Sequence, residues 1–579
     1  MKPKLLLIFA ALSAIASCTE ERFESAPPVP QYLETKSFGR QVEFGKETVL
    51  GEKIEDPYSL ETMRKAVRQL KLLRYDDAFT NITDIQASHL YIKFTPKDTI
   101  DLELLNRDDN ILLYNHPLDR EILVSGPDYH DPEAPDNALP YLYASVPVGY
   151  PLLNKVDHIV LDSLYFPDES PEYSSGIFNT ENIHALENVA TAIAENTDTD
   201  LSISLSADDH FYPEGYVRMY DSYLDSNVCL EGAKVILRKG THSHAFITDK
   251  NGYFKSDKRF KQMAGVHIYW EANPWYIKND MTKAHSYFGT AYYNDPGPFV
   301  CDIYKGMYKV PSFGAIHRAI HKFCYAPDEE VYGLSRPKSL TKIAIKYIHV
   351  TAKDENGHMN PSRIFNDIVI YYQGTPEPNG VCKAEGIYKT TMHELAHFIH
   401  CHTGGLAEFN RTKNFIKESW AVFVAWLLTN DTYTRLGKPI DKKKYYIPSL
   451  TISPKSHELI TIPNPSFYYI VPNSFNYQHW YTNNNSSTNE YRYTPLFIDL
   501  YDDSNQHGYE RLINPDKDTY LYVNDLIKDI PPRVLQDVVY RSENKNDFIN
   551  IMTQMCDEKK YNLTQETLNT MMQYYELVN

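Results

Sequence analysis

The sequence predicts a multidomain α+β protein, and three observations support this prediction. The chain has 579 residues, which is more than one hydrophobic core usually organises. Residues 56–285 mix helical periodicity with short alternating strands, whereas residues 286–579 carry mainly helical patterns. The formal net charge is -18, and no run rich in lysine and arginine occurs. We therefore expect no nucleic-acid partner.

The N-terminus has the pattern of a bacterial lipoprotein signal. A basic start precedes the apolar run Leu5–Ile15, which is too short to span a bilayer. The run ends in Ile15–Cys18, which resembles a lipobox. This resemblance implies a signal peptide over residues 1–17, a lipid on Cys18 and a membrane partner, the bacterial outer membrane. Acidic residues follow in Thr19–Glu21, as in exported Bacteroidetes lipoproteins, so we expect a cell-surface or periplasm-facing protein.

Residues 18–55 and 56–205 differ in pattern. The first range contains several prolines and little periodicity, so we predict a tether. The second range is predicted to be a mixed α/β module. Ser59–Leu73 has apolar residues at helical spacing, and Ala87–Lys97 alternates like a strand that ends at a proline.

Residues 210–285 are predicted to form a β-sandwich. Several alternating segments occur there, and an Asn-Gly turn interrupts one of them. These segments are Gly215–Asp221, Leu230–Arg238, Thr248–Phe254 and Val266–Trp270. Their order resembles the transthyretin-like, carboxypeptidase-regulatory sandwich of the immunoglobulin-like class, which implies a spacer or adhesive role. His242 and His244 are expected in a connecting loop, facing solvent.

The stretch after residue 389 contains the residues that we predict to bind a metal ion and to act as a base. His393-Glu-Leu-Ala-His397 has two histidines one helical turn apart, so both imidazoles lie on one helix face and can bind one Zn²⁺. Glu394 is then beside the metal-bound water and is predicted to be the general base.

A catalytic zinc site needs a third protein ligand. His400 lies a further turn along and is not expected to converge on the same ion. Glu418 is the better candidate, because it lies on a second predicted helix, Asn414–Leu428, beyond a Gly-Gly stop. Small residues at Ala421 and Ala425 would allow this helix to approach the first.

The two helices together resemble the gluzincin metallopeptidases, the thermolysin-like group with a glutamate on the helix after H-E-x-x-H. The resemblance implies a zincin domain over residues 286–579 that hydrolyses peptides or proteins with one Zn²⁺. It also implies an edge strand before the zinc helix, for which Asp367–Tyr372 is the candidate. Val422 stands where this family has an acidic partner for the first histidine, so Asp499 or Asp502 is a candidate for that role.

The group that holds the oxyanion is left open. Gluzincins use a tyrosine or histidine outside the motif, and Tyr491, Tyr493, His479 and His507 are candidates. The alternative to a peptidase is a surface adhesive or binding lipoprotein with a degenerate or structural zinc site. The intact Glu394 favours the peptidase, because a structural site has no use for a base.

Overall fold

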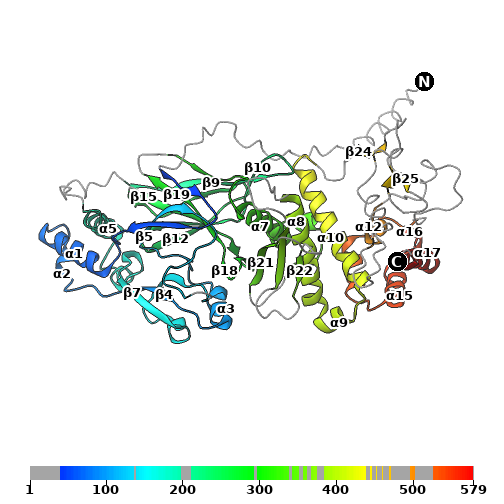
Figure 1. Ribbon diagram of the computed structural model, residues 1–579, viewed down its shortest axis with the longest axis horizontal. Coiled ribbons are helices and arrows are strands. Elements are labelled where there is room, and N and C mark those ends of the chain that lie inside the picture. Colours follow the sequence, from blue (N-terminus) through cyan, green and yellow to red (C-terminus); the bar gives the residue numbers. More distant parts are fainter. Residues whose placement is uncertain are drawn as a thin grey trace, which may run out of the picture.

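The computed structural model describes most of the chain between residues 40 and 577. The described residues are 40–135, 138–196, 210–261, 263–292, 297–337, 342–350, 357–360, 367–373, 384–438, 444–445, 451–452, 459–460, 469–470, 494, 496–502 and 526–577. They form helices and several separate sheets, as the α+β prediction requires. Figure 1 shows the N-terminal region at one end, sheets in the middle and the C-terminal helices at the other end.

The N-terminal region contains the predicted helix and strand. Helix α1 (Leu60–Leu72) begins at Ser59, whose hydroxyl accepts a hydrogen bond from the Thr62 backbone N–H at 3.1 Å. One face of α1 is buried and packs against α5 (Thr180–Ala194). Strand β4 (His89–Phe94) lies between β6 and β7. The predicted helix at 59–73 and strand at 87–97 are confirmed.

Further short helices and strands belong to this region, together with β6 and β7. They are β2 (Glu43–Phe44), β3 (Val49–Lys53), α2 (Asp77–Asn81), α3 (Thr99–Arg107), β5 (Arg120–Ser125), β6 (Leu142–Pro147), η1 (Pro151–Asn154), β7 (His158–Leu164), η2 (Pro167–Glu169) and α4 (Pro171–Ser174). The predicted tether over 18–55 is wrong from residue 40 onward. There β1 (Arg40–Gln41) pairs with β19 (His285–Tyr292), while β2 and β3 pair with β5, so these backbone groups are held in sheets.

Two central sheets share one apolar core, as the sheets of a β-sandwich do. Their strand orders are β1-β19-β15-β11-β12 and β10-β9-β13, with β20 beside β9. The chain passes from one sheet to the other at a turn where Gly252 has φ +72°, which favours glycine. The strands of these two sheets are β9 (Glu214–Asp221), β10 (Ser226–Cys229), β11 (Lys234–Lys239), β12 (His242–Ile247), β13 (Tyr253–Lys255), β15 (Met263–Tyr269), β19 (His285–Tyr292) and β20 (Phe299–Ile303), together with β1. Strands β8 (His210–Phe211) and β14 (Phe260–Lys261) pair with each other in a separate two-stranded sheet.

A further sheet crosses the domain boundary expected at residue 285. Its order is β16-β17-β21-β23-β22, with β18 beside β17. Its strands are β16 (Glu271–Ala272), β17 (Trp275–Asn279), β18 (Thr282–Lys283), β21 (Ile343–Val350), β22 (Gly357–Met359) and β23 (Ile368–Gln373). Strand β17 belongs to the connection between β15 and β19, yet it pairs in parallel with β21. A boundary at 285 therefore does not separate the sheets, because this connection adds strands to the sheet that packs beneath the helix of His393 and His397.

Helices cover this sheet and continue to the C-terminus. Helix α8 (Ala384–Ile399) packs against α7, α10, β22 and β23. The other elements are α7 (Val310–Tyr325), η3 (Asp328–Val331), η4 (His400–Gly404), α9 (Leu406–Arg411), α10 (Asn414–Arg435), β24 (Lys444–Tyr445), β25 (Thr451–Ile452), β26 (Leu459–Ile460), β27 (Tyr469–Ile470), α12 (Leu496–Tyr501), α14 (Pro532–Val539), α15 (Lys545–Met555), α16 (Glu558–Tyr561) and α17 (Gln565–Leu577). In the part of the chain that the structure describes, no helix combines the length and apolar character needed to cross a membrane.

Candidate metal centre

Helix α8 presents the two motif histidines because its opposite face is anchored in the core. Met392, Leu395, Ala396 and Ile399 are all buried. The helix passes into a π-helical turn, η4, which ends before Gly405 at φ +101°. The predicted helix and its Gly-Gly stop are thus confirmed. Such π-helical turns occur frequently at functional sites.

The structure brings His393, His397 and Glu418 together. The two Nε2 atoms lie 3.2 Å apart, and Glu418 Oε2 lies 3.3 Å from His393 Nε2 and 3.2 Å from His397 Nε2. Donors held at about 2.0–2.1 Å around one tetrahedral zinc ion lie roughly 3.3 Å apart. The three atoms therefore have the mutual spacing that a shared metal ion requires.

Helix α10 places Glu418 by packing closely on α8. Its residues Ala421, Val422 and Ala425 are buried, so their small side chains allow the close approach. Burial of the Glu418 carboxylate opposes ionisation, but the neighbouring His397 and His393 rings hold its pKa well below the usual range. The carboxylate is therefore charged and available as a ligand at neutral pH.

Glu394 lies on the sheet side of α8. It is buried, and a Cβ added at Gly357 would lie 3.1 Å from Glu394 Oε1. Gly357 begins β22, which pairs antiparallel with β23 and is the last strand on this side of the described sheet. The predicted edge strand, Asp367–Tyr372, is a strand but not the edge, because β22 covers it.

The neighbouring histidines take other roles, as expected. His400 is fully buried and stacks on Tyr540, with ring centroids 4.7 Å apart. Burial lowers the pKa of His400 to about 3. The His402 ring faces back along the helix, with its Nδ1 2.8 Å from the Phe398 carbonyl oxygen. Neither ring belongs to the candidate ligand group that the described residues form.

An acidic residue outside the motif was expected to orient the first motif histidine. His397 Nδ1 is buried without a hydrogen-bond partner among the described residues. Val422 is buried and apolar, and Asp499 is buried on α12, which packs against α10. A role for Asp499 or Asp502 in orienting His393 stays a prediction.

Several predicted residues lie outside the described residues: Cys18, Tyr491, Tyr493, His479 and His507. Thr494, which follows the tyrosines, is described. Its backbone N–H donates to Ser419 Oγ at 2.9 Å, and the two side-chain oxygens lie 2.7 Å apart. The chain at Thr494 is therefore fixed beside the residue that follows Glu418.

The structure corrects the interpretation of His242 and His244. They lie on strand β12 rather than in a loop, and His242 is only 2% exposed. Together with Asp168 they form a second group of potential metal ligands. The sequence signal was the alternation itself, because residues i and i+2 of a strand face the same side.

The edge strand β22 was also missed. It has three residues and no alternating pattern, so only its pairing with β23 reveals it. Comparisons of the chain with protein-family models, with curated proteins and with solved structures found no match.

Proposed function

We propose that this chain is a lipid-anchored zinc metallopeptidase of the gluzincin type that hydrolyses peptide bonds. The observation that carries the proposal is the convergence of two imidazole nitrogens and one carboxylate oxygen at 3.2–3.3 Å. Glu394 lies between the two histidines on the same helix. Two histidines and one glutamate leave a coordination position for water, as catalytic zinc sites do.

His393, His397 and Glu418 would hold the metal in this mechanism. Zinc bound there would supply Lewis-acid chemistry, which would lower the pKa of a bound water towards neutrality and polarise the substrate carbonyl. Glu394 accepts the proton of the attacking water and then delivers it to the leaving amine. Burial of Glu394 limits its exchange with bulk solvent.

Strand β22 supports peptide as the substrate class. It lies at the end of the described sheet and beside Glu394, as the contact of Gly357 indicates. An extended peptide pairs with such an edge through main-chain hydrogen bonds. Tyr491 and Tyr493 remain candidates for holding the oxyanion, because Thr494 next to them bonds to Ser419.

The metal content of purified protein tests the ligand set. After dialysis against Zn²⁺, Glu418→Ala is expected to lose the catalytic equivalent that the wild type retains. His402→Ala is the matched control and keeps that equivalent, since His402 bonds to a backbone carbonyl. If Glu418→Ala retains the metal and His400→Ala loses it, the third ligand is misassigned.

Turnover of a peptide library separates this proposal from a surface binding protein with a structural zinc site. We expect cleavage that a chelator abolishes and added Zn²⁺ restores. A zinc-loaded wild type that cleaves no member of a diverse library would contradict the peptidase. Mass-spectrometric identification of the cleaved bonds would define the specificity.

We also propose anchoring through a lipid on Cys18, on the basis of the lipobox resemblance of Ile15–Cys18. Cys18→Ser is expected to move the protein from the membrane fraction to the soluble fraction. Unchanged membrane association of this variant would refute the anchor at this residue.

We further propose that the region of the two central sheets is the carboxypeptidase-regulatory-like spacer.

A further inference from the structure

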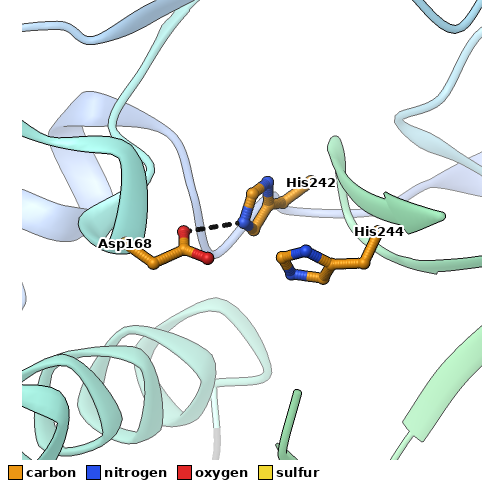
Figure 2. Close-up of side chains that lie close together, drawn as sticks. All are labelled: Asp168, His242 and His244. Atoms are coloured by element: carbon orange, nitrogen blue, oxygen red, sulfur yellow. Dashed lines mark hydrogen bonds and ion pairs between the residues drawn. The ribbon is translucent and has the colours of Figure 1, made fainter. Parts of the chain in front are cut away.

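A second group of potential metal ligands lies between the N-terminal region and the central sheets. His242 and His244 project from the same side of β12, and Asp168 comes from the short helix η2. Figure 2 shows the Asp168 carboxylate pointing at the His242 ring, with the His244 ring beside both. Asp168 and His242 are 74 positions apart in the chain, so the fold alone brings them together.

The geometry suits one shared ion. Asp168 Oδ1 lies 3.0 Å from His242 Nε2, and the two imidazole centroids are 4.4 Å apart. One donor atom from each residue lies within 4.8 Å of the others. The same limit holds for the three donor atoms of His393, His397 and Glu418. His244 is only half-buried, and its ring contacts are with His242 and Phe260.

The charged residues around Asp168, His242 and His244 favour a bound cation. Glu169 follows Asp168 and acts electrostatically on both imidazoles. Lys258 Nζ lies 3.2 Å from Asp168 Oδ2, but its side chain is 45% exposed. Lys258 can therefore move into water when a metal ion takes its place, without leaving a buried charge.

A simple ion pair between Asp168 and His242 accounts for only part of the arrangement. It gives no role to His244, a second imidazole placed against the first. Within the described part of the chain, no hydrogen bond to a ring nitrogen of His244 is found. Imidazole nitrogens and a carboxylate oxygen together form a donor set typical of zinc.

We propose that Asp168, His242 and His244 bind a second Zn²⁺ ion that ties the η2 turn to strand β12. The role is structural, because Ser243 lies between these two histidines where Glu394 lies between His393 and His397, and the nearby Glu169 carboxylate pairs with His89. This inference does not depend on the peptidase activity of the first site.

Zinc stoichiometry of the full-length protein tests the proposal. The probe is Zn²⁺ alone, added to metal-free protein and measured after removal of the excess. The wild type is expected to hold two equivalents, and His244→Ala one. A variant with both His393→Ala and His397→Ala is expected to hold one, and the combination with His244→Ala none. His130→Ala, an exposed histidine outside both groups, controls for loss of any imidazole.

His244→Ala is the preferred variant because it removes a half-buried ring, whereas a change at His242 disturbs the core. Asp168→Asn keeps the size of the side chain and is expected to lose the same equivalent. Co²⁺ in place of Zn²⁺ gives a visible spectrum that reports the same site independently. If the variant lacking His393 and His397 binds no zinc while it remains folded, the group is an ion pair and the proposal is wrong. The proposal is equally wrong if His244→Ala and Asp168→Asn both keep two equivalents.

Discussion

Two neighbouring helices each carry histidines four residues apart, but only one pair forms part of a candidate metal centre. On α8, His393 and His397 meet the carboxylate of Glu418. On α7, the His317 and His321 rings stack on each other with centroids 5.7 Å apart. Helices α7 and α8 pack against each other, so the two pairs share one core but differ in what faces them.

The surroundings of His317 and His321 exclude the metal binding that is proposed for His393 and His397. His317 is fully buried, and its Nε2 lies 2.8 Å from the Glu231 carbonyl oxygen. His321 fills the space above Gly232, where an added Cβ would lie 2.3 Å from the ring. Burial lowers the pKa of both histidines to about 4. Two histidines at positions i and i+4 therefore do not make a catalytic metal site without a facing carboxylate and an adjacent base.

The largest expected effect comes from Glu394→Gln. The change keeps the shape of the side chain but removes the base, so hydrolysis is expected to fall by about 10²–10⁴. The zinc content is expected to stay unchanged, because His393, His397 and Glu418 remain. Peptide turnover and metal content, measured on the same preparation, check both statements.

The control for this variant lies on the other helix. His321→Gln is expected to keep both the zinc and the activity, because His321 faces Gly232 and Trp275. Activity close to wild type in Glu394→Gln would place the base elsewhere. Loss of zinc in that variant would show that Glu394 has a ligand role instead.

The difference between the pairs also shows how far the sequence could predict the structure. Helices α8 and α10, the Gly stop after α8 and the approach of Glu418 to the two histidines were predicted, because these features depend on periodicity within a few turns. The edge strand β22 was not, because its identity depends on pairing with β23. The burial of His242 was missed for the same reason, since its partner Asp168 is 74 positions away.

A second prediction concerns acid stability. His317 and His321 have pKa values near 4 in the folded protein, against about 6.5 when unfolded. Between these values the unfolded chain binds more protons, so stability is full above pH 6.5 and falls as the pH drops towards 4. Each pKa unit corresponds to about 1.4 kcal/mol. With the pKa of each histidine lowered by about 2.5, the α7 pair contributes an upper limit of roughly 7 kcal/mol to this loss.

Thermal unfolding from pH 7.5 to pH 4.5 measures this effect. Zinc-depleted wild type is compared with a variant that carries His317→Gln and His321→Gln, so that metal release does not contribute. The melting temperature of the variant is expected to fall less steeply with acidification. Parallel curves for the two proteins would show that the α7 pair does not titrate as its burial predicts.

The smallest expected effect tests the surroundings of Glu394. A Cβ at Gly357 would lie 2.9 Å from the Val369 carbonyl oxygen, which is backbone, and 3.1 Å from Glu394 Oε1. Gly357→Ala therefore has to displace β22, Glu394 or both, and small misplacements of a catalytic group reduce the rate.

We expect kcat/KM of Gly357→Ala to fall about 10-fold, with the zinc content unchanged. Gly306→Ala is the matched control. Its added Cβ would meet only the Tyr304 side chain, at 3.1 Å, so activity is expected to persist. If Gly357→Ala is fully active, β22 does not constrain the base. If it loses zinc in proportion to activity, the strand supports the ligands rather than Glu394. An intermediate activity with full zinc would show that β22 positions Glu394 beside the α8 histidines. Among the described residues, no such strand and base lie next to the α7 histidines.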